Sequence, residues 1–203
     1  SLGAAKKDSI VLGLSPSIML LIGADVLLEA KREMPGVFLS LSEERSNVLA
    51  DALERDQLDV ILAYNIGART GFERQAILEE DFLFVTSPEN APSAPTISLA
   101  EALEAELVIG GGRGLIRSIV ESEAQRFSLK LRVAFEGHSI NSMKSLIARG
   151  VGASVMPFSL AAEELRAGKL VGRKIDRPAL TRTLYAVLPA GRQPHAPDGE
   201  MMR

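Results

Sequence analysis

The sequence predicts an α/β protein made of two lobes, each with a parallel-rich sheet covered by helices. Short apolar segments alternate with amphipathic helical segments, which is typical of parallel strands buried on both faces. The alternation occurs twice, once on each side of a proline-rich connector at 87–96. A chain of 203 residues is long enough for two small lobes.

The first half of the chain predicts strands and helices in alternation. Ser15 precedes Pro16, and this pair favours a helix start because the hydroxyl can accept hydrogen bonds from first-turn N–H groups. The apolar residues of this helix expected toward the core are Ile18, Leu21, Ile22 and Leu28. The elements expected are strands at 9–14, 37–41, 59–63 and 82–86, and helices at 16–31 and from Ser46 onward.

The second half repeats the pattern after the connector. Met143, Leu146 and Ile147 share one apolar helix face, Gly150 suits the end of that helix, and Ser159 is expected to cap the last helix. The elements expected are strands at 107–109, 131–135, 151–156, 170–175 and 184–188, and helices at 115–127, 140–149 and 159–167. The lobes are predicted to span 9–86 and 87–188, with 189–203 returning to the first lobe.

Charge and composition argue against direct nucleic-acid binding and against a membrane span. The formal net charge is -3, and no stretch concentrates the Lys and Arg that neutralise phosphates. No apolar run reaches the roughly 18 residues that cross a bilayer, and the segment from Ser1 to Asp8 has no apolar signal-peptide core. Without cysteine there is no disulfide framework. These features predict a cytoplasmic protein with no membrane partner.

Residues that commonly carry catalysis or hold metals are scarce. The chain has 2 His and 0 Cys, so no metal-ligand set with recognisable spacing is found in the sequence. The stretch from Gly13 to Ser17 (GLSPS) lacks the second glycine of a nucleophile elbow. The stretch from Gly110 to Gly114 (GGGRG) is neither a P-loop nor a dinucleotide fingerprint. The sequence therefore predicts a protein that is not an enzyme, with no catalytic residues, metal or cofactor.

Six segments occur along the chain in the order found in one protein family. They are IVLGLSPS (10–17), EMPGVFLSLSE (33–43), LADALERDQLDVILAYN (49–65), LEEDFLFVTSP (78–88), MKSLIARGVGASVMP (143–157) and LYAVLP (184–189). Each is a common α/β fragment, and the ordered set carries the specificity. The set resembles the effector-binding (substrate-binding) domain of LysR-type transcriptional regulators, nearest the nitrogen-assimilation control branch.

This resemblance implies a fold like the type 2 periplasmic binding proteins, with two Rossmann-like lobes joined by crossing strands. It implies that a small-molecule effector binds in the cleft between the lobes, and that the domain forms dimers and tetramers. Effector binding then controls DNA binding and transcription through a winged helix-turn-helix domain. That domain is expected before this segment in the full-length protein and is absent from this chain. A ligand shifts such an assembly only if it prefers one arrangement of the lobes.

The resemblance and the strand ends together mark nine candidate ligand contacts. Strand ends are where open α/β sheets bind ligands. The structural alternatives are helix caps for the serines, a turn for Asn65, and an exposed or structural side chain for His138. Glycines let the backbone approach a ligand and Arg113 suits a carboxylate, so a small anionic effector is expected. The candidates are Ser15, Pro16, Ser17, Ser46 and Asn65 in the first lobe, and Gly111, Arg113, His138 and Ser139 in the second.

A stand-alone solute-binding protein of the same fold is the alternative function, because fold alone does not decide function. The absence of a signal-peptide pattern in the segment from Ser1 to Asp8 favours the regulator. A prephenate-dehydratase-like pair of lobes is disfavoured, since the catalytic Thr-Arg-Phe motif of that family is missing.

Overall fold

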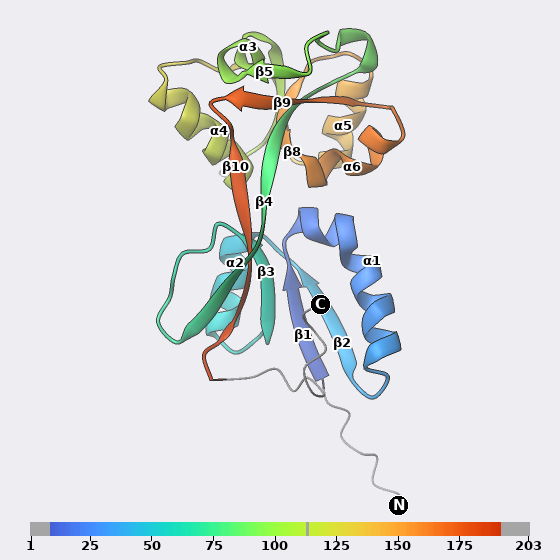
Figure 1. The fold of residues 1–203 in the computed structure, drawn as a ribbon, viewed down its shortest axis with the longest axis vertical. Coiled ribbons are helices and arrows are strands. Elements are labelled where there is room, and N and C mark those ends of the chain that lie inside the picture. The colour runs from blue at the N-terminus through green and yellow to red at the C-terminus, as the bar shows by residue number, and fades with distance from the viewer. Residues whose placement is uncertain (1–8, 113, 192–203) are drawn as a thin grey trace, which may run out of the picture. The chain divides into compact units, whose positions relative to one another are not determined.

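The computed structural model describes residues 9–112 and 114–191, and the chain divides into two compact units (Figure 1). Unit 1 comprises Ser1–Leu78 and Thr183–Arg203, and unit 2 comprises Glu79–Arg182. Two strands, β4 (Phe72–Thr86) and β10 (Thr181–Pro189), contribute residues to both units. The sequence predicted that the lobes end at 86 and 188, where strands end. In the structure the boundary between the units lies inside β4 and β10.

Unit 1 is built on a sheet in the order β2-β1-β3-β10. Strands β1 (Ser9–Leu14), β2 (Phe38–Glu43) and β3 (Val60–Tyr64) are parallel, and β10 runs antiparallel to β3. Leu14 lies opposite both Glu43 of β2 and Leu62 of β3, so the carboxyl ends of the three strands meet at one edge. The strand–helix alternation expected for this half is confirmed.

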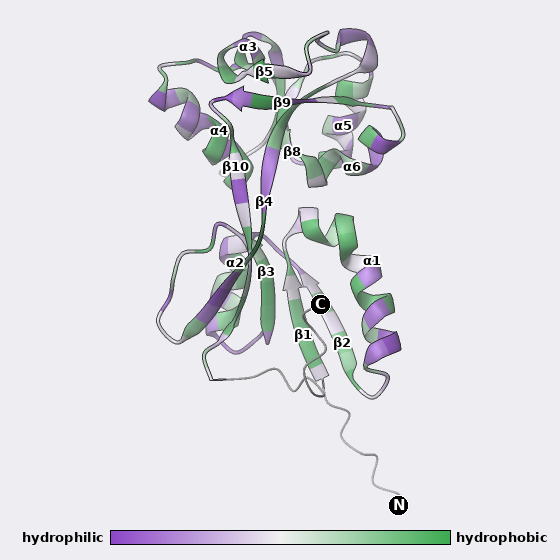
Figure 2. Cartoon of the chain, in the orientation of Figure 1, coloured by the Kyte–Doolittle hydropathy of each residue, from purple (hydrophilic) through white to green (hydrophobic). Residues whose placement is uncertain are grey.

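Two helices cover the sheet of unit 1. Helix α1 (Pro16–Glu33) packs on β1 and β2, and α2 (Ser46–Glu54) packs on β3 and β1. Strand order reverses at β1, so right-handed connections put the two helices on opposite faces. Ile18 is buried as expected, whereas the expectation for Leu28 is wrong, since this side chain is 68% exposed. Helix α1 has both buried and exposed apolar residues, and hydrophobic residues dominate its first turns in Figure 2, so apolar spacing alone did not identify its buried face.

Unit 2 has a more mixed sheet than the sequence predicted. Strand β4 pairs antiparallel with β8 (Ser154–Pro157) and β9 (Val171–Arg177), and β9 pairs parallel with β5 (Thr96–Ser98). A separate parallel pair is formed by β6 (Glu106–Gly110) and β7 (Arg132–Gly137). The helical elements are η1 (Pro88–Asn90), α3 (Leu99–Glu104), α4 (Leu115–Arg126), α5 (Ile140–Ala148) and α6 (Phe158–Arg166).

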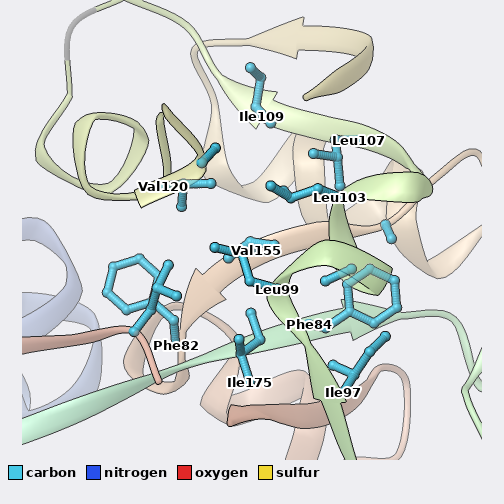
Figure 3. Packing of buried hydrophobic residues seen from close by; sticks show 14 residues of the cluster. Phe82, Phe84, Ile97, Leu99, Leu103, Leu107, Ile109, Val120, Val155 and Ile175 are labelled. Atoms are coloured by element: carbon cyan, nitrogen blue, oxygen red, sulfur yellow. The ribbon is translucent and has the colours of Figure 1, made fainter. Parts of the chain in front are cut away.

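The interior of unit 2 holds two apolar clusters. The first is drawn in Figure 3 and joins β4 and β9 to α3, α4 and β6. Its members include Phe82, Phe84, Leu99, Leu103, Leu107, Val120, Val155 and Ile175. The second contains Met143 and Ile147 of α5, and Leu146 packs against it, which confirms the predicted inner face of that helix.

A buried ionic network also lies within unit 2. The side chain of Arg182 is 3% exposed and that of Glu80 is 8% exposed. Arg182 Nε donates to Glu80 Oε2 at 2.8 Å, and Arg182 Nη2 donates to Ser159 Oγ at 3.0 Å. Glu80 Oε1 accepts from the backbone N–H of Ser159 at 2.6 Å. The Glu80 carboxylate thus binds both the Arg182 guanidinium and the first turn of α6. The two buried charges are paired, which offsets the cost of removing them from water.

Candidate functional site

Ser15 lies at the edge of unit 1 where β1 ends and α1 begins. Its N–H donates to Leu62 O at 3.1 Å, and its carbonyl accepts from Ile18 and Met19 at 3.0 and 2.9 Å. The expected capping bond from its hydroxyl is not formed. Ser15 is 4% exposed, and its Oγ has no hydrogen-bond partner in the described part of the chain. A buried hydroxyl without a partner costs about 1–3 kcal/mol. Pro16 and the buried Ser17 follow as the first residues of α1.

Ser46 and Asn65 lie at the same edge and have structural partners. Ser46 begins α2, and its Oγ accepts from the N–H of Tyr64 at 3.1 Å, so it joins α2 to the end of β3. The helix is preceded by Arg45 as its N-cap residue, so Ser46 is not the cap. Asn65 has a φ of 51°, as its predicted turn role requires. Its Oδ1 accepts from Thr183 N–H at 2.9 Å, which ties β3 to β10.

The glycine loop is residues 110–114, and its described residues, 110–112 and 114, lie at the corresponding edge of unit 2. Gly110 and Gly137 end the parallel strands β6 and β7, and the N–H of Gly111 donates to Gly137 O at 2.7 Å. A Cβ on Gly111 would clash with the imidazole ring of His138, so the ring lies directly against this glycine. The exposed Ser139 caps α5, since its Oγ accepts from Ser142 N–H at 3.3 Å. Arg113 lies outside the described residues.

An ion pair that sequence analysis missed lies beside this loop. Arg117 Nη1 is 3.0 Å from Glu136 Oε2, and Arg117 Nε donates to Glu121 Oε1 at 2.6 Å. The hydrogen bond to Glu121, and to a smaller extent the one to Glu136, raises the pKa of Arg117. The hydrogen bond that Arg117 donates lowers the pKa of Glu136 below its usual value, and the bond from Gly112 N–H lowers it further by a smaller amount. Both groups are therefore charged near neutral pH.

The geometry brings the candidates together in two sets, one on each unit. Ser15, Ser46 and Asn65 share the edge of unit 1, and Gly111, His138 and Ser139 share the edge of unit 2. Helix N-termini point at both edges and favour partial negative charge. Such edges can hydrogen-bond a small polar ligand. Within the described residues no cluster of three or more metal-ligating side chains occurs, and none of the described helices is long and apolar enough to cross a membrane.

Comparison with known proteins gives one consistent family. Residues 4–198 match the model of the LysR substrate binding domain. The chain is 28% identical to the uncharacterized HTH-type transcriptional regulator YfiE of Escherichia coli (strain K12) over 167 residues, 82% of this chain and 57% of that protein. It is 27% identical to the nitrogen assimilation regulatory protein nac of the same organism over 191 residues, 94% of this chain and 62% of that protein. The chain thus spans about three fifths of the length of these relatives.

Solved structures agree on the fold. The CcmR regulatory domain of Synechocystis PCC6803, solved in complex with 2-PG, matches with a TM-score of 0.79 at 19% identity. The match covers 92% of this chain and 89% of that one. The predicted two-lobed α/β fold and the resemblance to LysR regulators, including the nitrogen-assimilation branch, are confirmed. The relatives are regulators, which supports this interpretation over a stand-alone solute-binding protein. The chain belongs to the LysR substrate binding domain family.

Proposed function

We propose that this chain is the effector-sensing part of a LysR-type transcriptional regulator that acts in the cytoplasm and is not an enzyme. The family match and the two relatives named as regulators support this proposal. The relatives are longer than this chain, which leaves room for a DNA-binding domain in the full-length protein. DNA contact is assigned to that winged helix-turn-helix domain, because this chain carries a net charge of -3.

The proposed effector contacts are the edge residues of each unit. They are Ser15, Pro16, Ser17, Ser46 and Asn65 in unit 1, and Gly111, Arg113, His138 and Ser139 in unit 2. The observation that carries the proposal is the hydroxyl of Ser15, which is buried at the strand edge without a hydrogen-bond partner among the described residues. An unmet hydrogen-bonding group beside a helix N-terminus suits a small polar or anionic ligand.

Replacing Ser15 with alanine is expected to raise stability and weaken effector binding at the same time. Stability rises by about 1 kcal/mol because an unpaired buried hydroxyl is removed. Binding weakens because the hydroxyl is a proposed ligand contact. Thermal shift against a metabolite set that includes 2-PG measures both, since a ligand at a hundredfold excess over Kd stabilises by about 2.7 kcal/mol.

The matched control is Ser87→Ala. Ser87 in unit 2 is 3% exposed, and its Oγ also has no hydrogen-bond partner in the described chain. The same gain in stability is expected there, with the ligand-induced shift unchanged. Equal ligand-induced shifts in both variants would remove Ser15 from the contacts. Absence of a stabilising metabolite for the unsubstituted chain would count against the sensing function.

The regulatory role is tested on the full-length protein. It is expected to retard DNA from its own upstream region in a mobility-shift assay, and the stabilising metabolite is expected to change the affinity or the pattern of bands. The 203-residue chain alone is expected to give no shift. A full-length protein that binds the metabolite but no DNA would support the stand-alone binding protein instead.

Self-association is proposed to use the apolar face of α1 and β2. Helix α1 exposes Leu20, Leu27 and Leu28, and β2, which packs against this helix, exposes Phe38. Strand β2 is also the edge strand of its sheet, so its outer side is open to a partner. Exposed apolar groups that gather on one face are typical of protein interfaces. A second copy of the domain, as the family resemblance implies, is the proposed partner.

Replacing Leu28 with lysine is expected to convert a dimer into a monomer, because a charge would be buried without a partner in the interface. Sedimentation velocity of the 203-residue chain at micromolar concentration measures the change. The control is Ile77→Lys on β4, at a side chain 49% exposed outside the proposed face, which should leave the sedimentation coefficient unchanged. A dimer that survives Leu28→Lys but not Ile77→Lys would place the interface elsewhere.

A further inference from the structure

Among the described glycines of the loop, Gly111 is held by its N–H bond to Gly137 O at 2.7 Å and by the ring of His138, whereas Gly110, Gly112 and Gly114 have little packing around them. A Cβ added to Gly110, Gly112 or Gly114 would meet no atom within 4 Å. Gly112 also has a φ of +74°, a conformation that glycine adopts readily. A loop of this composition loses much conformational entropy on ordering, so other groups must fix it if it is to present a defined surface.

Two side-chain contacts hold the loop, one on each side of Gly111. Arg117 Nη1 donates to the carbonyl oxygen of Gly110 at 3.4 Å. Glu136 Oε1 accepts from the N–H of Gly112, also at 3.4 Å. Both contacts are long, so each alone is weak. They act together, because Arg117 and Glu136 pair with each other at 3.0 Å.

The ion pair is itself anchored on both sides of the loop. Arg117 lies in the first turn of α4, directly after the loop, and Glu121 on the next turn fixes its guanidinium at 2.6 Å. Glu136 lies in β7, one residue before the strand ends at Gly137. The Arg117 side chain is 24% exposed and that of Glu136 is 46% exposed, so solvent screens this pair in part.

We propose that Arg117 and Glu136 are positioning residues that order the glycine loop for ligand binding without touching the ligand. The inference rests on the proposed function in one respect, namely that the loop contacts the effector. Arg117 and Glu136 are not among the nine predicted contacts. Through them, the affinity for the effector would depend on an ion pair that touches the backbone of the loop.

The first experiment needs no ligand. In the 203-residue chain, Arg117→Met is expected to lower the backbone 15N order parameter of Gly112 from about 0.85 to below about 0.6. Hydrogen exchange of the Gly111 amide is expected to accelerate about fivefold. The control is Arg126→Met in the last turn of the same helix, where the arginine pairs with Glu123 at 3.2 Å. Glu136→Gln keeps an acceptor for Gly112 N–H and should show a smaller effect than Arg117→Met.

The second experiment measures affinity for the metabolite that gives the largest thermal shift, or for 2-PG where it is the stabiliser. Arg117→Met is expected to raise Kd about fivefold, and Arg126→Met to leave it unchanged. Loop dynamics that respond equally to both substitutions would overturn the proposal. An ordering effect confined to Arg117→Met, with Kd unchanged, would overturn the link to binding. Failure of every metabolite to bind the unsubstituted chain contradicts the proposed function, while the relaxation data still decide whether the pair orders the loop.

Discussion

Replacing Arg182 with methionine is expected to lower the free energy of unfolding by about 3–5 kcal/mol. The change removes the guanidinium that pairs with Glu80 Oε2 and bonds Ser159 Oγ, both in the interior of unit 2. A carboxylate deprived of such a partner keeps the desolvation cost of its charge and loses the attraction that offset it. Denaturant unfolding followed by circular dichroism measures the loss.

The matched control is Lys174→Met. Lys174 Nζ pairs at 2.8 Å with Asp81, the residue next to Glu80 in β4, but the side chains of this pair are 50% and 40% exposed. Removing one partner of an exposed pair costs less than about 1 kcal/mol. Similar losses for the two substitutions would mean that burial does not set the strength of the Glu80–Arg182 pair. The double substitution Glu80→Leu with Arg182→Met should recover part of the stability, because neither charge of the pair is left buried, while Ser159 N–H and Oγ lose the partners they have here.

Replacing Gly152 with alanine is expected to destabilise the protein by about 3 kcal/mol. An alanine Cβ there would lie 2.6 Å from Glu106 O, a backbone atom that also accepts from Ala153 N–H at 2.9 Å. Backbone cannot rotate away as a flexible side chain does, so β6 must shift. Because β6 ends at Gly110, the substitution is also expected to disturb the glycine loop. Thermal unfolding and the Gly112 amide resonance report the two effects.

Gly36→Ala serves as the comparison for that substitution. A Cβ at Gly36 would meet nothing within 4 Å, and its φ lies outside the left-handed region. Alanine there is expected to be neutral or to stabilise by about 0.4–1 kcal/mol, because the unfolded chain loses freedom. If Gly152→Ala changes the free energy of unfolding no more than Gly36→Ala does, β6 can shift at little cost.

Sequence periodicity predicted the buried elements well and the exposed ones poorly. The alternation of apolar strands and helices from Ser9 to Tyr64 was correctly assigned, because each segment has a buried face. Strand β4 begins at Phe72, ten residues before its predicted start at 82. Its residues 73–79 are all exposed, so no apolar alternation marks them as a strand.

Two helix boundaries show what local signals were overlooked or misread. Helix α3 was not predicted, although Ser98 and Glu101 form a capping box that the sequence displays. Ser159 was predicted to cap α6, but the helix begins one residue earlier, with Pro157 as its N-cap residue. The Ser159 hydroxyl accepts from Arg182 instead. A partner so distant in sequence leaves no local pattern.

The candidate site was predictable only where it follows strand ends or matches the family resemblance. Asn65 was chosen because it follows a strand, whereas Ser15 and Ser46 were chosen from the family resemblance, and all three lie at the edge of the sheet of unit 1. Arg117 and Glu136 were missed because they lie on different elements and meet only when β6 and β7 pair. Sequence spacing cannot show such convergence.

The order of strands in unit 1 has a consequence for synthesis on the ribosome. Strand β10 completes the sheet of unit 1 by pairing with β3 from Ile61 to Tyr64, yet nearly all of unit 2 is translated between these two strands. At ordinary elongation rates the apolar edge of β3 therefore waits on the order of ten seconds for its neighbour. Unit 2 is continuous and can fold first, while the open β3 edge is available to pair with another chain. Nascent chains that stop before Thr181 therefore leave this strand edge open to aggregation.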